Sequence, residues 1–162
     1  MQSPLTRLDP TQPPLRWLLR FPSFLYRARL GWLLGGRFVQ LTVRGRRSGL
    51  PREVVLEVIG GSPAVGELLV ASGWGRRAQW FRNVLANPRV QVQVGRLQYT
   101  GEVVAVGESE AAQVLREYAG AHRWAYKWFI GPLVLGRRPS GTSEEFASLA
   151  HILPVLMVRA AA

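Results

Sequence analysis

The sequence predicts a mainly β (α+β) protein in which antiparallel strands close into a small barrel with flanking helices. Several short runs alternate apolar with polar residues, as half-buried antiparallel strands do, and turns containing Gly or Pro separate them. The runs expected to form strands are 38–44, 53–59, 67–72, 89–94, 97–106 and 151–159. Five or six strands are too many for one flat sheet in a chain of 162 residues, and closure removes the exposed sheet edges.

Composition indicates a globular chain without a metal site. Hydrophobic residues make up 48% of the sequence and charged residues 19%, which excludes a disordered polar chain. There is no cysteine, so disulfides and thiolate metal sites are excluded, and only two histidines, His122 and His151, argue against zinc or haem. We expect an amino-terminal arm with amphipathic helices over residues 1–36 and one barrel domain over residues 37–162.

The charge is strongly positive and comes almost entirely from arginine. The formal net charge is +11, and Lys127 is the only lysine. Such a charge favours phosphates, polyanions or anionic lipid surfaces, and arginine suits paired contacts with phosphate oxygens. We expect no nucleic acid as a partner, because the arginines gather at two glycine turns and not in a stripe with interleaved aromatic residues.

The amino-terminal region is expected to be a loose arm followed by two short helices. Residues 1–14 contain four prolines, and Pro22 divides the apolar but arginine-containing stretch 15–35, which argues against a membrane-spanning helix. This basic amphipathic stretch can pack on its own domain or lie, through residues 15–34, on an anionic membrane surface. No signal-peptide pattern opens the sequence, so we expect a cytoplasmic protein, either free or peripheral at the inner face of the membrane.

The first candidate site is the turn between the first two expected strands, residues 44–52. It contains Gly45, Gly49 and Pro51, which allow a sharp reversal of the chain. The other residues of interest are Ser48 and four arginines, which are Arg44, Arg46, Arg47 and Arg52. Backbone amides and guanidinium groups in such a turn can bind phosphate oxygens, whereas the alternative is a solvated basic hairpin tip.

The second candidate site follows the strand 67–72. Gly73, Trp74 and Gly75 lead through Arg76 and Arg77 into a helix expected over 77–86, which ends at Asn87-Pro88. A glycine loop before a helix start favours an anion, although it can also be an ordinary connection. Two arginine-rich glycine turns in one small chain together suggest a phosphorylated ligand.

The carboxy-terminal half continues with a hairpin and then helices. We expect a two-residue turn at Gly95-Arg96, a bulge or bend at Gly101, and a helix from residue 108 with Gly120 past its end. Residues 122–129 are rich in aromatic side chains, and residues 131–141 are expected to form a loop. Thr142 and Glu145 have the spacing of a capping box, and Pro154 restricts the last strand to an edge or a strand start.

Three ordered segments resemble one family. The stretch Gly45-Arg46-Arg47-Ser48-Gly49-Leu50-Pro51-Arg52 resembles the Gly-Arg-x-Ser/Thr-Gly-x-Pro-Arg signature of the deazaflavin-dependent nitroreductases, also described as deazaflavin-dependent quinone reductases. The segments 71–75 and 80–90 are similar to the family's second loop and to its Trp-aromatic-x-Asn-Leu-x-Ala-Asn-Pro-x-Val segment. The resemblance implies a split β-barrel of the flavin-reductase type, with a homodimer as a plausible assembly.

The resemblance also implies a cofactor site. The cofactor would be the reduced deazaflavin coenzyme F-420, with its phosphate and polyglutamate tail, and FMN is the alternative. The phosphate and tail would contact Arg46, Arg47, Ser48 and Arg52. The ring and linker would contact Ser72, Gly73, Trp74, Gly75, Val54 and Leu56, with Arg76 and Arg77 helping at the helix start. Trp80 and Asn83 are interpreted as a core aromatic and a buried polar anchor.

The expected reaction is hydride transfer from the reduced deazaflavin to a quinone, a nitro compound or an activated alkene. No Ser-His-Asp, metal or paired-carboxylate constellation is visible, and a redox enzyme needs none because the cofactor supplies the chemistry. Proton donors would be Ser72, Tyr126, His122 or water, with the acceptor held by aromatic residues of segment 118–129 or by the amino-terminal helices. The alternatives are a lipid- or fatty-acid-binding barrel without catalytic activity and an FMN-dependent reductase.

Overall fold

The computed structural model describes residues 35–162, and the side chains of residues 129, 130, 132 and 133 are excluded from the description. The expected arm, the two amino-terminal helices and their membrane contact lie outside the described residues. The described part has no helix both long and apolar enough to cross a membrane.

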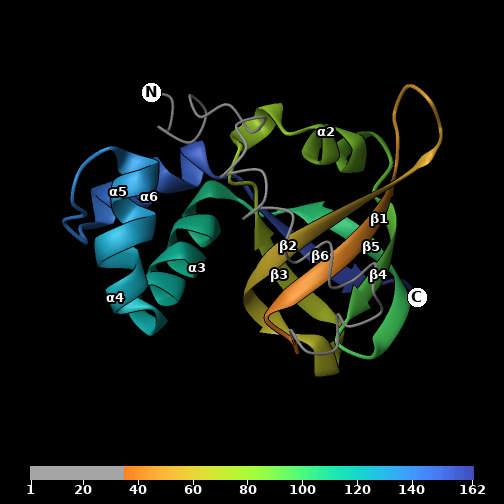
Figure 1. Cartoon of the computed structure of the whole chain (residues 1–162), viewed down its shortest axis with the longest axis horizontal. Coiled ribbons are helices and arrows are strands. Elements are labelled where there is room, and N and C mark those ends of the chain that lie inside the picture. Colours follow the sequence, from red (N-terminus) through yellow and green to blue (C-terminus); the bar gives the residue numbers. More distant parts are fainter. Residues whose placement is uncertain (1–34) are drawn as a thin grey trace.

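Six antiparallel strands form a closed barrel, which confirms the predicted fold class. The order around the barrel is β1-β2-β3-β6-β5-β4 (Figure 1). The strands are β1 (Phe38–Arg44), β2 (Pro51–Ser62), β3 (Glu67–Ala71), β4 (Arg89–Val94), β5 (Leu97–Ala105) and β6 (Val155–Ala160). The long β2 reaches further than the expected 53–59, and its register shifts between Val58 and Gly60.

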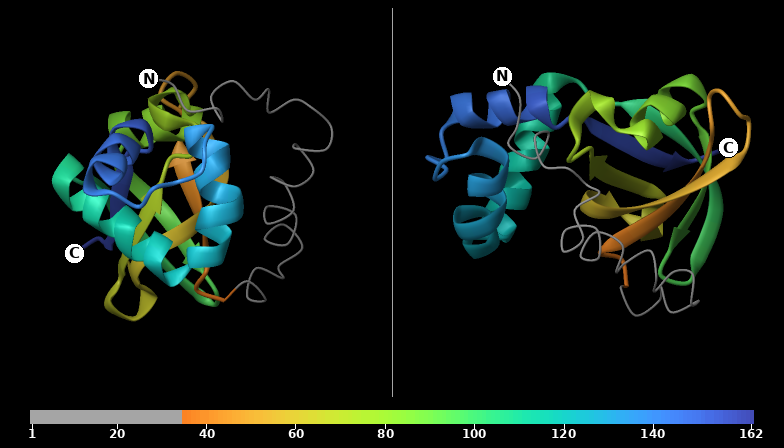
Figure 2. Two further views of the ribbon diagram at one scale, coloured as in Figure 1. Left: turned by 90° about the vertical axis from the view of Figure 1, so that its left-hand side faces the viewer. Right: turned by 45° about the horizontal axis from the view of Figure 1, so that its top comes forward.

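The helices cover two parts of the barrel. A short turn η4 (Gly75–Arg77) leads into α2 (Gln79–Ala86), which lies across the top of the barrel in Figure 1. A separate group of helices, here called the helical layer, lies to one side of the barrel (Figure 2). It consists of α3 (Glu108–Ala121), α4 (Arg123–Ala125), the π-helical turn η5 (Tyr126–Ile130), α5 (Gly131–Leu135) and α6 (Ser143–Ile152). The remaining short turn, η3 (Pro63–Val65), connects β2 to β3.

Two hydrophobic cores follow from the alternation of the strands. The inward residues of β1 and β4 fill the barrel together with Phe81 and Val84 of α2. Outward residues such as Ile59 and Leu69 pack against Leu115 and Leu149 of the helical layer. Full burial of a leucine-sized side chain is worth about 1.5–3 kcal/mol, so both cores hold their elements in place.

Several expected details are wrong, and close packing explains the clearest of them. Gly101 is not in a bulge, since it pairs in register with Val90 and Ala160. A Cβ atom at Gly101 would lie 2.8 Å from Val92 Cγ2 and 3.1 Å from the Arg159 carbonyl oxygen. Glycine is needed there for close approach of neighbouring strands.

The helical layer also differs from the expectation. Gly120 lies inside α3, which ends at Ala121, and the expected loop 131–141 begins with the helix α5. His151 belongs to α6 and not to the last strand, which begins at Val155 directly after Pro154. The two-residue turn at Gly95-Arg96 is confirmed by the pairing of Val94 with Leu97.

Candidate functional site

A cavity of about 550 Å³ lies between the β1–β2 turn and α2. It brings together residues of both arginine-rich turns predicted from the sequence. The lining residues are Val43, Gly45, Arg46, Arg47, Ser48, Arg52, Glu53, Val54, Trp74, Ala78, Gln79, Trp80 and Asn83. We call this space the arginine cavity.

The β1–β2 turn is held by its own backbone. The Gly45 amide donates to the Leu50 carbonyl at 2.9 Å, and the Gly49 amide donates to the Gly45 carbonyl at 2.8 Å. The Leu50 amide donates to Ser48 Oγ at 3.3 Å. A Cβ atom at Gly45 would lie 2.7 Å from Ser48 Oγ, so glycine keeps the turn tight.

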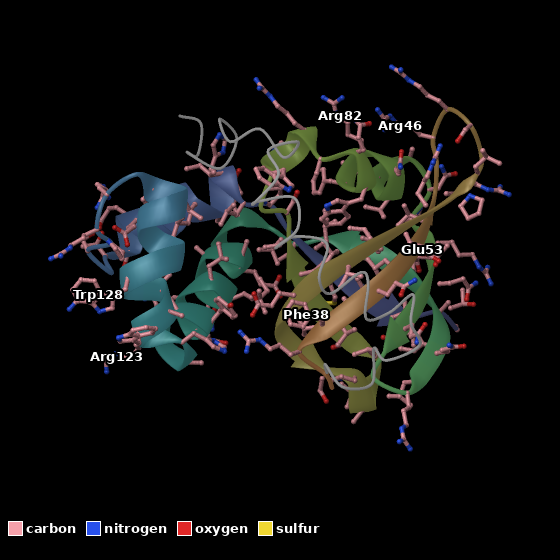
Figure 3. The ribbon with its side chains drawn as sticks, in the orientation of Figure 1. Phe38, Arg46, Glu53, Arg82, Arg123 and Trp128 are labelled. Carbon is pink, nitrogen blue, oxygen red and sulfur yellow. The ribbon has the colours of Figure 1, made fainter. Side chains whose placement is uncertain are left out.

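Arg46 connects this turn to α2 (Figure 3). Its backbone amide and Nη1 both donate to Asn83 Oδ1, at 3.2 and 2.9 Å, and its Nη2 donates to Gln79 Oε1 at 3.0 Å. Asn83 is 7% exposed, which agrees with its interpretation as a buried polar anchor. Because both partners are neutral amides, they orient the guanidinium group without neutralising its charge.

The charged residues that line the cavity carry a net positive charge. Arg46, Arg47 and Arg52 line it together with one carboxylate, that of Glu53. Within residues 35–162, the ion pairs involve Arg37, Arg137, His151 and Arg159, all outside this cavity. Guanidinium groups without an acidic partner in a concave site favour an anionic ligand.

An apolar wall faces these charges. Val54, Trp74 and Trp80 are each partly buried against the barrel core, and they also line the cavity. Trp80 meets Phe81 edge-on, with ring centroids 6.0 Å apart. Sequence reasoning treated Trp80 as a core residue and missed Gln79, whose exposed polar side chain carried no distinguishing pattern. Leu56 packs against the barrel core and is outside the set of residues that line the cavity.

The loop after β3 contributes residues to the arginine cavity and to a second one. Ser72 is 0% exposed, and its hydroxyl donates to the Gly75 carbonyl at 2.7 Å. The Ser72 amide donates to the Pro154 carbonyl, and the Gly75 amide donates to the Ser72 carbonyl. Ser72 therefore stabilises the loop from inside. Trp74 lines the arginine cavity, whereas its neighbour Gly73 lines the second cavity.

The second cavity has a volume of about 200 Å³ and lies between the barrel and the helical layer. We call it the tyrosine cavity. Its lining is mainly apolar, with two phenol groups and one carboxylate. The lining residues are Glu57, Ile59, Ala71, Gly73, Leu115, Tyr118, Tyr126, Val134, Leu149 and Leu153.

Glutamate side chains fix both tyrosines. The Tyr126 hydroxyl donates to Glu145 Oε1 at 3.1 Å, and burial followed by the Glu145 charge raises the pKa of Tyr126 well above 10.0. Burial, and then Glu57, raise the pKa of Tyr118 in the same direction. Both phenols are therefore protonated at neutral pH.

Glu145 is itself held by several donors. Its carboxylate is 3% exposed and accepts hydrogen bonds from the amide and hydroxyl of Ser140 and from the Gly141 amide, and it pairs with Arg137 at 3.1 Å. Burial opposes ionisation, but the bonds from Ser140, Gly141 and Tyr126 outweigh it and lower the pKa of Glu145. One half of the expected capping box is confirmed, since the Glu145 amide donates to Thr142 Oγ1 at 3.3 Å, whereas the Glu145 carboxylate accepts from the Gly141 amide at 3.1 Å.

The other residues named from the sequence lie outside both cavities. His122 is exposed, with Nδ1 3.0 Å from the Tyr118 carbonyl oxygen. Its ring is tilted by 31° against the Tyr118 ring, with the ring centroids 4.4 Å apart. Arg76 and Arg77 are exposed in η4. The Arg76 carbonyl accepts a hydrogen bond from Arg82 Nε at 3.4 Å, which links η4 to α2.

The protein is a closed antiparallel barrel whose cavity combines cationic groups with an aromatic wall. These features suit a cofactor that carries a phosphate and a flat ring. The chain belongs to the F420H(2)-dependent quinone reductase family, whose model matches residues 20–128. This membership makes the protein an oxidoreductase that depends on reduced coenzyme F-420, and it confirms the resemblance found in the three sequence segments.

Solved structures share the fold. One is an F420-H2 dependent reductase, FDR-A, with 21% identity over 76% of this chain and 94% of that one, and a TM-score of 0.51. A second is a domain-swapped dimer, with 19% identity over 85% of this chain and 99% of that one, and a TM-score of 0.52. A third, of unknown function from Agrobacterium tumefaciens, has 15% identity over 94% of this chain and 59% of that one, also with a TM-score of 0.52.

The arginine cavity fits coenzyme F-420 chemically. Its volume of about 550 Å³ lies within the range of about 300–1,000 Å³ that is usual for small-molecule sites. Arg46, Arg47 and Arg52 supply donors for phosphate and carboxylate oxygens, and Trp74 and Trp80 supply an apolar wall for a flat ring.

Proposed function

We propose that this protein reduces a quinone with reduced coenzyme F-420. The phosphate and tail of the cofactor would bind in the arginine cavity, and its ring would extend along the loop 72–75 to contact a quinone held at the tyrosine cavity, since hydride transfer requires the reacting atoms to be in contact. The observation that carries this proposal is the loop 72–75, which borders a cationic cavity on one side and an apolar cavity with phenol groups on the other. Nitro compounds and activated alkenes are the alternative acceptors, and the family name favours the quinone.

In the arginine cavity, the chain binds and orients. Arg46, already aligned by Asn83 and Gln79, would hold phosphate or carboxylate oxygens together with Arg47 and Arg52. Ser48 lines the same turn and would add its hydroxyl. Val54, Trp74 and Trp80 would exclude water from one face of the ring. When bound, the reduced deazaflavin supplies the hydride, and the remaining contributions come from the protein.

In the tyrosine cavity, the chain would position the acceptor and hold protons. Reduction of a quinone to a quinol adds one hydride and one proton, and the protonated phenols of Tyr118 and Tyr126 lie at this cavity. We assign Tyr126 as the proton donor to the quinone oxygen. Its hydroxyl would turn from Glu145, to which it donates in this structure, toward the quinone oxygen as the hydride is transferred, and the proton would be replaced from solvent. Ser72 is buried and His122 does not line the tyrosine cavity, so we favour Tyr126 over both as the proton donor.

A fluorescence titration tests cofactor binding, with coenzyme F-420 and FMN compared in parallel. We expect the double variant Arg46→Ala/Arg52→Ala to weaken F-420 binding by at least about 100-fold, since each charge-assisted contact is worth about 1.5–3 kcal/mol. Arg96→Ala, which removes an exposed arginine from the β4–β5 turn, is the matched control. Unchanged affinity in the double variant, or tighter binding of FMN, would contradict this assignment.

Steady-state reduction of a soluble quinone then tests the reaction. We expect Tyr126→Phe to lower kcat for the quinone about 10–100-fold while the Kd for F-420 stays unchanged. If Tyr126→Phe lowers kcat equally for nitro compounds and for quinones, the assignment of the site would stand, but the class of acceptor would not be decided.

A homodimer also remains a prediction, which one domain-swapped structural relative supports. Size-exclusion chromatography with light scattering tests it directly, and a monomer mass at micromolar concentration would overturn it.

A further inference from the structure

An exposed surface on the helical layer combines tryptophans with cations. Trp124 is 69% exposed and Trp128 is 46% exposed, which is unusual for the largest apolar side chain. They stand four residues apart on consecutive helical segments, α4 and η5. Arg123, Lys127 and Arg138 accompany them, and we call this group the tryptophan surface.

Two of the cations lie over the indole ring of Trp128. Lys127 Nζ is 5.6 Å from the centre of the Trp128 ring, and Arg138 Cζ is 4.8 Å from it. In Figure 3, Trp128 and Arg123 project outward from the edge of the helical layer, away from the barrel. The same helical turn is anchored on its inner side, where Tyr126 stacks on Phe146 at 5.8 Å and bonds to Glu145. The outward side chains therefore stand on a fixed support.

The surface carries positive charge without an acidic neighbour in sequence. Residues 121–141 contain Arg123, Lys127, Arg137 and Arg138 and no Asp or Glu. In the described part of this segment, the ion pair is that of Arg137 with Glu145. The charges of Arg123, Lys127 and Arg138 are exposed to solvent.

We propose that the tryptophan surface binds the surface of an anionic lipid bilayer. Indole rings prefer the zone between head groups and acyl chains, where an apolar body and a polar N–H are both satisfied. Lysine and arginine next to them meet lipid phosphates, and each such cation strengthens binding to an anionic bilayer about fivefold. The pattern of two exposed indoles flanked by three cations matches that zone in both polarity and charge.

Single-stranded nucleic acid is the competing occupant, because it also combines phosphates with stacking rings. It is less favoured, since single strands bind in a cationic groove and no residue of the tryptophan surface lines either cavity.

Vesicle flotation with the full chain tests the proposal. The probes are vesicles of phosphatidylcholine alone and of phosphatidylcholine with about a third phosphatidylglycerol, with tryptophan fluorescence recorded in parallel. Two variants are compared with the wild type, Trp124→Ser/Trp128→Ser and Lys127→Gln/Arg138→Gln. The matched control is Arg89→Gln/Arg96→Gln, which removes the same charge from exposed positions on β4 and its turn.

We expect binding to the anionic vesicles, a blue shift of fluorescence, and weakening of about 25-fold in the Lys127→Gln/Arg138→Gln variant from its two lost cations. The tryptophan variant should lose at least tenfold, and the control should change less than twofold. Equal weakening of vesicle binding in the control would show that binding depends on net charge alone. Unchanged binding in both test variants would show that another surface binds the vesicles. Either result would overturn the proposal. Tryptophan-dependent binding of a single-stranded RNA homopolymer without vesicle binding would do so as well. Far-ultraviolet circular dichroism confirms that each variant is folded.

Discussion

The two cavities on either side of the loop 72–75 are built by different means. The arginine cavity is formed by two small elements, a tight turn and a two-turn helix. Hydrogen bonds from Arg46 to Asn83 and Gln79 join them. The tyrosine cavity is formed where two large surfaces meet, and its polar groups come from elements more than 60 residues apart, such as Glu57 and Tyr126. The residues of the arginine cavity can be predicted from local sequence motifs. Those of the tyrosine cavity come together only when the helical layer packs on the barrel.

This difference predicts that the two cavities can be damaged separately. Changes around Asn83 should affect cofactor binding more than acceptor binding, and changes around Gly73 or Glu145 should affect acceptor binding more than cofactor binding. The variants below are ordered by the size of the expected effect.

Removal of the Glu145 carboxylate should have the largest effect on stability. Glu145→Ala leaves donors of Ser140, Gly141 and Tyr126 without their buried acceptor, and we expect a loss of about 1–3 kcal/mol in the free energy of unfolding. Urea denaturation measures it. Glu144→Ala, at the exposed neighbouring position, is the control and should change stability by less than about 0.5 kcal/mol.

The same carboxylate predicts a pH dependence. The pKa of Glu145 lies below its usual value of 4.5, so its contribution is complete above that value and is lost as the pH falls through the native pKa. Stability in Glu145→Gln should therefore fall less steeply below pH 4.5 than in the wild type. Parallel curves for the two proteins would show that other carboxylates dominate acid unfolding.

A larger side chain at Gly73 should block the tyrosine cavity. A Cβ atom there meets nothing within 4 Å, so Gly73→Leu can fold without a backbone clash. We expect kcat/KM for a quinone to fall about 30-fold because the side chain takes volume from a cavity of only about 200 Å³. The Kd for F-420 should stay within twofold, and Gly73→Ala serves as the matched small substitution. An equal loss of F-420 binding would mean that the two cavities form one site.

Loss of the amide that orients Arg46 should weaken the cofactor. Asn83→Ala removes the acceptor of both the Arg46 amide and its Nη1, and we expect F-420 binding about tenfold weaker. Gln79→Ala removes a single exposed bond and should cost about twofold to threefold. Quinone KM at saturating F-420 should be unchanged in both variants, and a shift in that KM would contradict the separation.

The smallest effect concerns Tyr126 and alkaline pH. Tyr126→Phe removes one hydrogen bond to Glu145 and should lower the free energy of unfolding by about 1 kcal/mol near neutral pH. The pKa of Tyr126 is raised above 10.0, so its contribution is present below that value and is lost as the pH rises through the native pKa. Stability of the variant should thus decline less than that of the wild type above pH 10. Identical alkaline slopes would assign the decline to other groups.

Sequence reasoning succeeded where the signal was local. The alternation in 38–44 and 89–94 predicted strands, Gly95-Arg96 predicted a hairpin, and the arginine turn was recognised from its glycines and charges. It failed where a residue's role is set by a distant neighbour. Gly101 was expected to bend its strand, but it allows Val92 and Val158 to approach, and nothing near residue 101 in the sequence indicates this.

The candidate site shows the same limit. The sequence predicts that Arg46 binds a ligand, but its alignment by Asn83, 37 residues away, depends on the packing of α2 over the turn. The sequence pattern assigns Ser72, Gly73 and Trp74 to one site. The fold shows that the Ser72 hydroxyl is buried, that Gly73 lines the tyrosine cavity and that Trp74 lines the arginine cavity.

From the sequence alone follow the barrel class, the cationic turn and the family, because strand period, turn residues and charge are properties of neighbouring positions. The tertiary structure alone decided that the arginine and tyrosine cavities both border the loop 72–75, that Glu145 fixes Tyr126, and that Trp128 is exposed beside two cations. These depend on side chains meeting across elements, and close packing, which no local pattern encodes, determines which of them meet.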